Sequence, residues 1–599
     1  MIGFAALRWV TIDPAANRAA HDLHAVLEQR GWRSVIDAPG WRLLADPRTN
    51  VDLVRGGAAS RTIVIGHLFD RRATEQSRHA FGVVPDDADD FADLCTRLVE
   101  TCWGAYAAIE IDPAAPDRVS LFRDPIGMME CVTWAYHGVR IATSVAEVIL
   151  PLAMPDGLGI CWATLAQLVR FPGGAGETLP LDGVTALDAG CLFAVDDKAV
   201  RSIRLWSPAD AARRRVSHPR PPRDYLPDLI DATLGAWGTR FGTAIAELSG
   251  GLDSAIVAAG LSRCRPRADV RWFHYVAPDP QGDERVWARA TATQLALPVE
   301  EIAVGERSID AAVAEALPFG LRPSVASLSL FHDRDLAERG RALGASCLYT
   351  GHGGDALFYQ FATPSLAGDI WRGRRSLGTR LALTQDLARW TGCSVWSVSA
   401  AALADRRRQI PPPDPHFPLD LVARDVPRRW PALSSLEDAL DLPPSKQIHI
   451  LQFAAARAVF APTWTNQAMT VVHPLLSQPI VEHALALSAL DLTQARRDRA
   501  LIREAYAHRL PAILVDRRGK GSITAYYGRM LARSVDVLRA YLLDGVLMGN
   551  GILDRAAVER VLDEDAIMLT NVYAEIFAML FAERWARGWL SIIASARAS

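Results

Sequence analysis

The chain has 599 residues and a formal net charge of −3 at pH 7, and half of its residues are hydrophobic. This composition argues against a disordered chain and predicts substantial buried cores, which we expect to form two large domains. The arginines occur in short scattered clusters, so nucleic acid binding is not expected as the main activity.

Cysteine usage and the first residues indicate the compartment. Eight cysteines are spread along the chain without a C-x-x-C pair, which argues against a disulfide framework and a zinc ribbon. The N-terminus lacks the basic and apolar regions of a secretory signal, and no apolar stretch is long enough to span a membrane. We therefore expect a cytoplasmic protein that does not contact a membrane.

Short β-like runs separated by turn-forming residues fill the first part of the chain, at 61–69, 104–112, 118–122, 139–143 and 191–196. They predict a sheet-rich domain over residues 1–207. Residues 212–223, "ARRRVSHPRPPR", are dense in Arg and Pro, which favours an extended linker. We place this linker at residues 208–223.

After the linker, strand candidates alternate with helical patterns. The strand candidates lie at 243–248, 270–276 and 345–350. This alternation predicts an α/β fold over residues 224–599, with a doubly wound parallel sheet, helices on both faces and a helical C-terminal portion. A Pro-rich patch at 410–420 is expected to be a surface loop.

The segment Ser249-Gly250-Gly251-Leu252-Asp253-Ser254 stands between an apolar strand and an Ala-rich helix. A helix N-terminus behind a glycine turn binds anions, because its free N–H groups and its dipole both favour negative charge. Asp253 would repel a bare phosphate, so its presence implies a divalent cation, and oxygen ligands suit Mg²⁺. The alternative is a plain strand-to-helix turn with a Ser or Asp cap.

This loop resembles the pyrophosphate loop of the ATP pyrophosphatases, and specifically that of the asparagine synthetase superfamily. The resemblance implies that Ser249, Gly250, Gly251, Leu252, Asp253 and Ser254 bind ATP while a substrate carboxylate attacks the α-phosphorus, giving an acyl-adenylate and pyrophosphate. The N-terminal domain would then be a glutaminase-like (Ntn-type) αββα domain, and the C-terminal domain an adenylating domain.

Further segments resemble the superfamily in the same order. They are "LFRDPIGMMECVTWAYHGVRIATSVAEV" in the first domain, "PDPQGDERVWARATATQLAL" (278–297), "TGHGGDALF" (350–358), "HPLLSQPIVEHAL" (473–485) and "RALIREAYAHRLPAILVDRRGKG" (499–521). The resemblance places Gly351 near the adenosine or α-phosphate and makes Asp355 the second Mg²⁺ carboxylate beside Asp253.

Two departures from asparagine synthetase affect the expected reaction. A working glutaminase of this superfamily needs Cys directly after the initiator Met, whereas this chain reads Met1-Ile2-Gly3, so we expect a degenerate amidotransferase domain. In the second half, His352 and Ala356 replace the two Glu residues of the family motif. These changes alter the acceptor site and leave the phosphate and metal positions in place.

"GHGGDALF", "HPLLSQP" and "RRGKG" most resemble the lasso-peptide macrolactam synthetases. The resemblance implies ATP-dependent adenylation of an Asp or Glu side chain in a leader-trimmed precursor peptide, followed by attack of the peptide's N-terminal amine to form an isopeptide ring. A leader peptidase and a leader-recognition protein are the expected partners.

Two further residues are assigned catalytic roles through the resemblance. Lys520 would stabilise negative charge on the α-phosphate and the tetrahedral carbon, and the alternative is a surface lysine in an Arg-rich loop. His352 would be the general base for the attacking amine, and the alternative is a structural or substrate-contact histidine. Glu482 and Arg503 are expected to be scaffold residues.

Other functions remain open at this point. One is an ammonia-dependent asparagine synthetase or a β-lactam synthetase. Another is a non-catalytic nucleotide-binding scaffold, which the retention of Asp253, Asp355 and Lys520 opposes.

Overall fold

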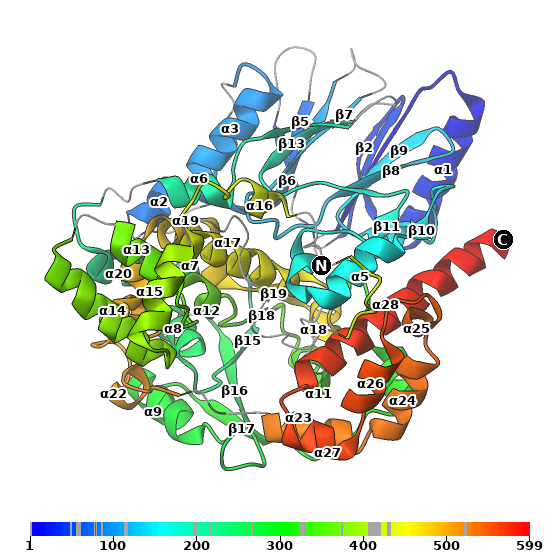
Figure 1. Ribbon diagram of the computed structural model, residues 1–599. Helices are drawn as coiled ribbons and strands as arrows, with labels where there is room; N and C mark the ends of the chain where they lie inside the picture. Colours follow the sequence, from blue (N-terminus) through cyan, green and yellow to red (C-terminus); the bar gives the residue numbers. More distant parts are fainter. Residues whose placement is uncertain are drawn as a thin grey trace.

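A computed structural model gives the structure of the protein (Figure 1). It describes residues 3–47, 49, 51–54, 61–76, 78, 81–85, 88–112, 118–195, 200–214, 218–264, 268–323, 330–372, 375–404, 421–427, 433–519, 521 and 524–598. The Pro-rich patch at 410–420, predicted as a surface loop, lies outside these residues.

Two antiparallel six-stranded sheets form the N-terminal part, at the top of Figure 1. The first has the order β12-β8-β9-β1-β3-β2 and the second β14-β13-β7-β6-β5-β4. Their bounds are β1 Phe4–Trp9, β2 Arg33–Ala38, β3 Trp41–Ala45, β4 Val51–Val54, β5 Arg61–Asp70, β6 Cys102–Ile111, β7 Val119–Arg123, β8 Val132–Tyr136, β9 Val139–Thr143, β12 Thr185–Ala186, β13 Cys191–Val195 and β14 Val200–Arg204; β10 (Gly159–Ile160) and β11 (Leu181–Asp182) pair separately.

The core of this part lies between the two sheets and contains Phe4, Leu43, Ile63, Ile109 and Leu121. Helix α1 (Pro14–Gln29) packs on β1 and β9, and α3 (Phe91–Thr101) packs on β6 of the other sheet. This arrangement is the predicted αββα sandwich. The remaining helices of this part are α2 (Arg71–Glu75), α4 (Ala146–Ile149) and α5 (Trp162–Arg170).

The C-terminal part is built on a five-stranded parallel sheet with the order β17-β16-β15-β18-β19. The strands are β15 (Ala244–Glu247), β16 (Val270–Val276), β17 (Val299–Ala303), β18 (Cys347–Tyr349) and β19 (Thr470–Val472). Counted along the chain the order is 3-2-1-4-5, so the direction of winding reverses between β15 and β18. This confirms the predicted doubly wound sheet.

Helices cover both faces of this sheet. Ala244 and Ala246 of β15 belong to the core that includes α8 (Leu252–Arg263), whereas Ile245 packs with Leu336 of α11 (Leu330–Ala342) on the other face. Because both faces are covered, β15 is apolar at successive positions rather than alternately.

The helices after β14 are mostly short. Their bounds are α6 Pro208–Arg213, α7 Pro222–Gly238, α9 Arg285–Leu295, α10 Ala311–Ala316, α12 Gly354–Leu357, α13 Leu366–Arg372, α14 Leu377–Thr391, α15 Val395–Ala404, α16 Ser434–Glu437, α17 Pro444–Ala456, α18 Trp464–Ala468, α19 Gln478–Ala486, α20 Ala489–Thr493, α21 Ala500–Ala505, α22 Ala512–Val515, α23 Thr524–Ala532, α24 Val535–Leu543, α25 Val546–Gly549, α26 Arg555–Val561, α27 Glu564–Leu569 and α28 Tyr573–Ala598. Among the described residues, no helix is both long and apolar enough to cross a membrane.

Part of the predicted linker is helical, which corrects the expectation of an extended segment. Ser207 caps α6 by accepting a hydrogen bond from the backbone N–H of Asp210, and Pro208 occupies the first turn. A serine cap followed by proline favours a helix start, and this local signal outweighs the Arg- and Pro-rich composition downstream. The boundaries of the two domains stay a prediction.

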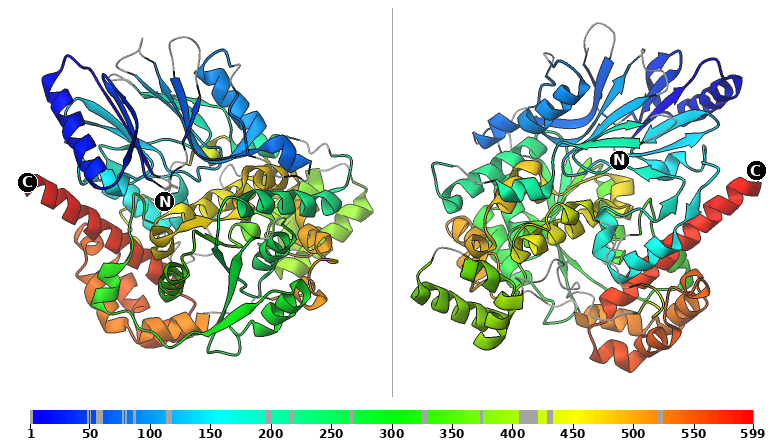
Figure 2. Two further views of the ribbon diagram at one scale, coloured as in Figure 1. Left: turned by 180° about the vertical axis from the view of Figure 1, so that it is seen from behind. Right: turned by 45° about the horizontal axis from the view of Figure 1, so that its top comes forward.

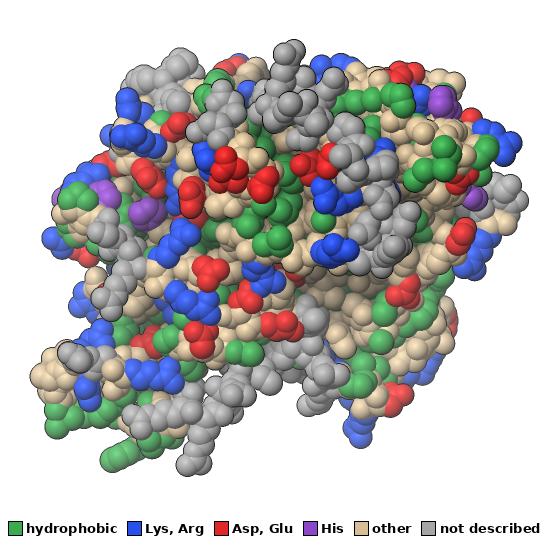
Figure 3. Space-filling model, turned by 90° about the horizontal axis from the view of Figure 1, so that it is seen from above, with side chains coloured by type: hydrophobic (Ala, Val, Ile, Leu, Met, Phe, Trp, Pro, Cys, Tyr) green, Lys and Arg blue, Asp and Glu red, His purple; other side chains and the backbone are tan. Residues whose placement is uncertain are grey.

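The two halves are joined over a broad contact. Figure 2 shows the long helix α28 running from the C-terminal part toward the N-terminal sheets, and α28 contacts both α5 and β10. On the face seen in Figure 3, acidic and basic side chains are intermixed.

Candidate functional site

The loops after β15 and β18 meet at the point where the winding of the parallel sheet reverses. The two strands are direct neighbours, with Ala244 paired to Cys347 and Ala246 to Tyr349. In doubly wound sheets, ligands bind beyond the carboxyl ends of the strands at this position. The two glycine-rich segments identified in the sequence, 249–254 and 350–355, therefore lie at the ligand-binding end of the sheet.

The 249–254 loop is held by its own hydroxyls. Ser254 Oγ donates to the Gly251 carbonyl at 3.1 Å and accepts from the Ser249 backbone N–H at 3.2 Å. Gly250 has a φ of +84°, which favours glycine. No side chain caps the N-terminus of α8, where Gly251 is the N-cap residue. The loop thus presents a helix N-terminus without a side-chain cap, which suits an anion.

Two glycines of the second segment lie directly against the first segment. A Cβ atom on Gly351 would lie 2.5 Å from the backbone nitrogen of Ser254, and one on Gly354 would lie 2.6 Å from Cγ of Asp253. Between them, Gly353 has a φ of +92°. Gly351 and Gly354 are therefore explained by direct packing of the two loops, and Gly353 by its left-handed backbone conformation.

The two predicted metal carboxylates lie close to one buried arginine. Asp253 Oδ2 accepts a hydrogen bond from Arg499 Nη1 at 2.8 Å. Burial opposes the charge of Arg499, but Asp253, Asp498 and Asp355 outweigh burial and raise its pKa. Asp253 and Asp355 thus both interact with the positive charge of Arg499.

These residues fit Mg²⁺ bound together with phosphates. Mg²⁺ in nucleotide sites is held by one or two carboxylates plus phosphate oxygens and water, not by a closed protein cage. Asp253 and Asp355 supply such a pair and both line the cavity described next. In the described part of the chain there is no group of three or more His, Cys, Asp or Glu residues that would hold a metal by itself.

A cavity of about 500 Å³ opens above the two loops, and we call it the switch-point cavity. Its volume lies within the range of about 300–1,000 Å³ that is usual for small-molecule sites. Its lining includes Ser249, Gly251, Leu252, Asp253, Ser254, Gly351, His352, Asp355, Asp498, Arg499, Arg503, Arg517, Arg518 and Gly519. Gly250 is held in the same loop, so the predicted nucleotide-binding and metal-binding residues are brought together.

His352 is exposed at this cavity and stands next to a second histidine. The ring centroids of His352 and His473 are 5.7 Å apart. The His352 backbone N–H donates to Thr350 Oγ1, and the same hydroxyl is hydrogen-bonded to Nδ1 of His473 at 2.6 Å. Burial lowers the pKa of His473 to about 3, with a smaller contribution from His352. His473 is therefore neutral at physiological pH.

Lys520 lies outside the described residues. Arg517, Arg518 and Gly519, which precede it in the chain, line the switch-point cavity.

Several residues of the cavity are not identified by the sequence. Arg499 pairs with Asp253, and His473 lies within the 473–485 segment, but the sequence pattern assigns neither of them a role. Glu247, which ends β15, pairs with His332 at 3.1 Å on the same cavity wall. An acidic residue at the end of an apolar strand is the signal that would have identified Glu247.

The two residues expected to be scaffold residues have structural partners. Arg503 pairs with Asp498 at 2.9 Å, and its Nη1 donates to the carbonyl of Val515 at 3.0 Å. Glu482 accepts hydrogen bonds from Trp206 Nε1 at 2.7 Å and Gln478 Nε2 at 2.9 Å, and it pairs with Arg71 of the N-terminal part. Glu482 therefore ties the two halves together.

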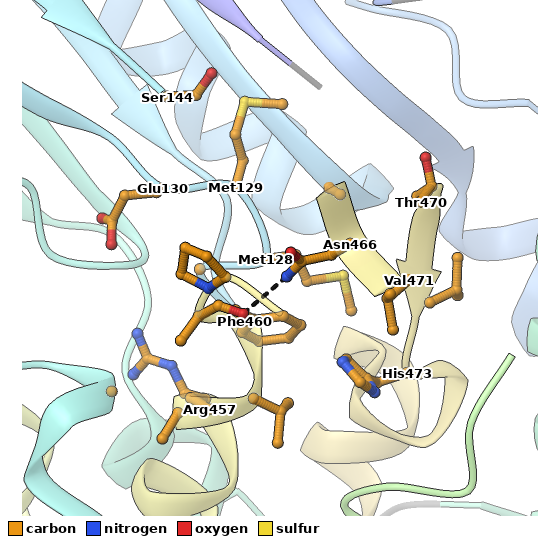
Figure 4. Close-up of a pocket in the computed structure, with 18 of the residues that line it drawn as sticks. Met128, Met129, Glu130, Ser144, Arg457, Phe460, Asn466, Thr470, Val471 and His473 are labelled. Atoms are coloured by element: carbon orange, nitrogen blue, oxygen red, sulfur yellow. Dashed lines mark hydrogen bonds between the residues drawn. The ribbon is translucent and has the colours of Figure 1, made fainter. Parts of the chain in front are cut away.

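A second cavity, of about 160 Å³, lies between the two halves, and we call it the interdomain cavity (Figure 4). In Figure 4, Glu130 and Arg457 lie on one side, Val471 and His473 on the other, and Met128 and Phe460 between them. Val459, Asn466, Val471 and His473 line both cavities, so they form the wall between them.

The R-D-P-x-G motif beside the interdomain cavity is structural in this chain. Asp124 accepts backbone hydrogen bonds from Ile126, Gly127, Met128 and Met129 at 2.7–3.1 Å. Arg123 donates to the carbonyls of Met129 and Leu187, each at 2.7 Å. Both side chains therefore hold the turn after β7.

The buried thiols of the N-terminal part are poor candidates for a nucleophile. Burial raises the pKa of Cys102 to about 11 and that of Cys131 to about 12, and it also raises the pKa of Cys95 and Cys191. A raised pKa disfavours the reactive thiolate.

Comparison with known proteins identifies the family of the C-terminal part. Residues 243–587, more than half of the chain, match the family described as asparagine synthase. The chain belongs to this family. Its members are ATP-dependent amide-forming ligases, generally Mg²⁺-dependent, and the matched region includes both glycine segments and the switch-point cavity.

No curated protein matches the chain. Two solved structures are similar at 10% sequence identity. Glutamine phosphoribosylpyrophosphate amidotransferase from B. subtilis has a TM-score of 0.22 and covers 67% of this chain and 92% of its own. A structure described as the allosteric regulatory enzyme of purine biosynthesis has a TM-score of 0.21 and covers 62% of this chain and 77% of its own. Because both TM-scores are low, neither structure supports a conclusion about the fold or function of this chain.

Proposed function

We propose that this member of the asparagine synthase family is a macrolactam synthetase of lasso-peptide biosynthesis. It activates an Asp or Glu side chain of a leader-trimmed precursor peptide with ATP, releasing pyrophosphate, and joins that carboxyl to the peptide's N-terminal amine. The precursor peptide is the proposed substrate, and a leader peptidase and a leader-recognition protein are the proposed partners.

The activation step is supported by the groups around the 249–254 loop. The N-terminus of α8 favours the pyrophosphate, and Arg499 adds positive charge behind Asp253. Mg²⁺ held by Asp253 and Asp355 would neutralise phosphate charge. Lys520 is proposed to stabilise the charge that develops on the α-phosphate and on the tetrahedral carbon.

The proposal that a peptide amine attacks the activated carboxyl is supported by His352 in the switch-point cavity. It stands where asparagine synthetases have a glutamate, and it is exposed to the space in which an acceptor would bind. A peptide amine is an ammonium ion in water and must lose a proton before it attacks. A histidine side chain is suited to accept that proton near neutral pH.

The neighbouring groups are arranged to keep His352 in place. Its backbone N–H is bonded to Thr350, and its ring lies beside the neutral ring of His473, which adds no positive charge. We therefore propose His352 as the general base of ring closure.

The test is pyrophosphate release with Mg²⁺ and ATP, comparing a leader-trimmed candidate peptide from neighbouring genes with aspartate plus ammonia. Release with the peptide, together with a product lighter by one water, is the expected result. Release with aspartate but not with the peptide would replace the proposal by an asparagine synthetase. A small amino-dicarboxylate as the active substrate would indicate a β-lactam synthetase.

Failure of every substrate, despite measured ATP binding and addition of the protease partner, would favour a non-catalytic scaffold. The role of His352 is tested separately with His352→Gln. Since the amine attack would slow while activation continues, we expect the peptide's activated carboxyl to be hydrolysed, so that pyrophosphate is released without ring formation. His508→Gln, at an exposed position away from the cavity, is the matched control.

A further inference from the structure

We infer that Glu284 is a positioning residue that holds Arg517 and Gly521, the two ends of the segment that carries Lys520, against the 249–254 loop. Glu284 is the N-cap residue of α9 and lies far in sequence from both segments that it joins. The inference rests on the proposed function for the role of Lys520, but the contacts that support it do not.

One carboxylate oxygen holds both ends of the segment. Glu284 Oε1 accepts from the backbone N–H of Gly521 at 2.8 Å and from Arg517 Nη2 at 2.5 Å. The same guanidinium donates through Nη1 to the carbonyl of Gly250 at 2.9 Å. Glu284 and Arg517 therefore form a bridge from the C-terminal segment to the proposed phosphate loop.

Close packing reinforces this bridge on both sides. A Cβ atom on Gly250 would lie 2.8 Å from Cβ and from the carbonyl oxygen of Glu284. A Cβ atom on Gly521 would lie 2.8 Å from Cγ of Glu284. Glycine at both positions thus lets the two segments press against the same side chain.

The bridge is shielded from water. The side chains of Glu284 and Arg517 are 12% and 9% exposed, and the Arg517 guanidinium lies 3.8 Å from the ring centroid of Trp287. A charge pair buried in this way is less screened than a surface pair, and loss of one partner leaves the other without compensation. Arg517 and the backbone of Gly521 are therefore held to Glu284 by buried contacts.

The contacts of Glu284 lie next to the residue that is proposed to act in catalysis. Gly521 directly follows Lys520, and Arg518 and Gly519, which precede it, line the switch-point cavity. A lysine that stabilises developing charge must be held in place, because a displacement of about 1 Å lowers the rate by about a hundredfold. Glu284 does not line the cavity in the described structure, and it holds the residue that follows Lys520, so we assign its effect on the reaction to Lys520.

The test combines hydrogen exchange with kinetics on the full-length protein. We expect Glu284→Gln and Glu284→Ala to speed amide exchange in peptides covering 515–521 by about tenfold or more, because a charged acceptor is lost. Glu301→Gln is the matched control, since Glu301 is also paired with an arginine, at 2.6 Å from Arg289, but on the surface of the same α9–β17 unit.

The kinetic arm uses pyrophosphate release with whichever acceptor supports turnover. Glu284→Gln should lower kcat by about 10–100-fold with a KM for ATP changed by less than about threefold, and Glu284→Ala should add little to the loss in a Lys520→Ala background. Unchanged exchange at 515–521 would overturn the anchoring. Additive losses in the double variant would overturn the action through Lys520. If no acceptor supports turnover, the proposed function fails while the exchange result still decides whether Glu284 anchors the segment.

Discussion

The two cavities that meet at His473 use their charged residues differently. In the interdomain cavity, Arg457 pairs with Glu177 at 3.0 Å and Arg123 is bonded to backbone carbonyls, so these charges hold the junction of the two halves. In the switch-point cavity, Asp253 and Asp355 stand beside Arg499 and a helix N-terminus without a side-chain cap.

The difference separates structural from chemical use of the same residue types. The interdomain cavity is about 160 Å³ and its arginines satisfy protein groups, whereas the switch-point cavity is about 500 Å³ and presents carboxylates, guanidiniums and backbone N–H groups to one open space. We expect substitutions in the switch-point cavity to affect turnover and those at the junction to affect stability.

The largest expected effect is at the carboxylates of the switch-point cavity. Asp253→Asn and Asp355→Asn should each lower the rate of pyrophosphate release by about 10²–10³-fold. Each substitution removes a negative charge that is proposed to hold the Mg²⁺ ion, and that ion would neutralise the phosphates. Thermal unfolding should confirm that both variants fold. A rate within about threefold of the wild type in either variant would contradict the assignment.

Glu482→Gln tests the junction between the two halves. This substitution breaks a buried charge pair with Arg71, so the free energy of unfolding should fall by about 3 kcal/mol, measured by urea unfolding. Burial alone would raise the pKa of Glu482, but Arg71, Gln478 and Arg214 outweigh it and lower the pKa. The variant's kcat should change little while it remains folded.

The sign of the pH dependence follows from that lowered pKa. Glu482 contributes stability above the unfolded value of about 4.5, and this contribution is lost as the pH falls through the lower folded pKa. The difference in stability between wild type and Glu482→Gln should therefore be constant near neutral pH and shrink below about pH 4. A difference that grows on acidification would contradict the ion pair.

Gly354→Ala tests the packing of the two glycine segments. The new Cβ would meet Asp253 Cγ at 2.6 Å, so we expect a cost of about 1–3 kcal/mol in stability and weaker binding of Mg²⁺ with ATP, measured by calorimetry. Gly305→Ala is the control, because nothing lies within 4 Å of its Cβ position. Equal effects of the two substitutions would show that the loop contact is unimportant.

The smallest effect is expected in the interdomain cavity. Met128 lines that cavity and not the other, so Met128→Leu should cost less than about 1.5 kcal/mol in stability and change kcat by less than about twofold. A large loss of turnover would show that the interdomain cavity takes part in the reaction.

Local patterns explain what the sequence predicts well. The strand, glycine turn and helix around Gly250 are encoded by consecutive residues, and so is the alternation that gives the parallel sheet. The partnership of Arg499 with Asp253 is not, because the two residues are 246 positions apart and Arg499 adopts a left-handed φ of +50° without being glycine. The link from Glu284 to Gly521 spans 237 positions and depends equally on the tertiary fold.

Helix α6 shows that a prediction from composition can also miss a local signal. The Arg- and Pro-rich composition of 212–223 predicts an extended chain, but the cap at Ser207 and the proline that follows it specify a helix just upstream. Averaged composition therefore concealed a signal carried by two residues.

The most direct test of the central claim follows an oxygen atom through the reaction. The side-chain carboxylate of the trimmed peptide is labelled with heavy oxygen, and the products of one turnover with Mg²⁺ and ATP are examined by mass spectrometry. Attack of that carboxylate on the α-phosphorus, followed by attack of the amine on the carbonyl carbon, predicts one labelled oxygen in AMP and none in pyrophosphate. Label in inorganic phosphate, with ADP as the nucleotide product, would contradict the account.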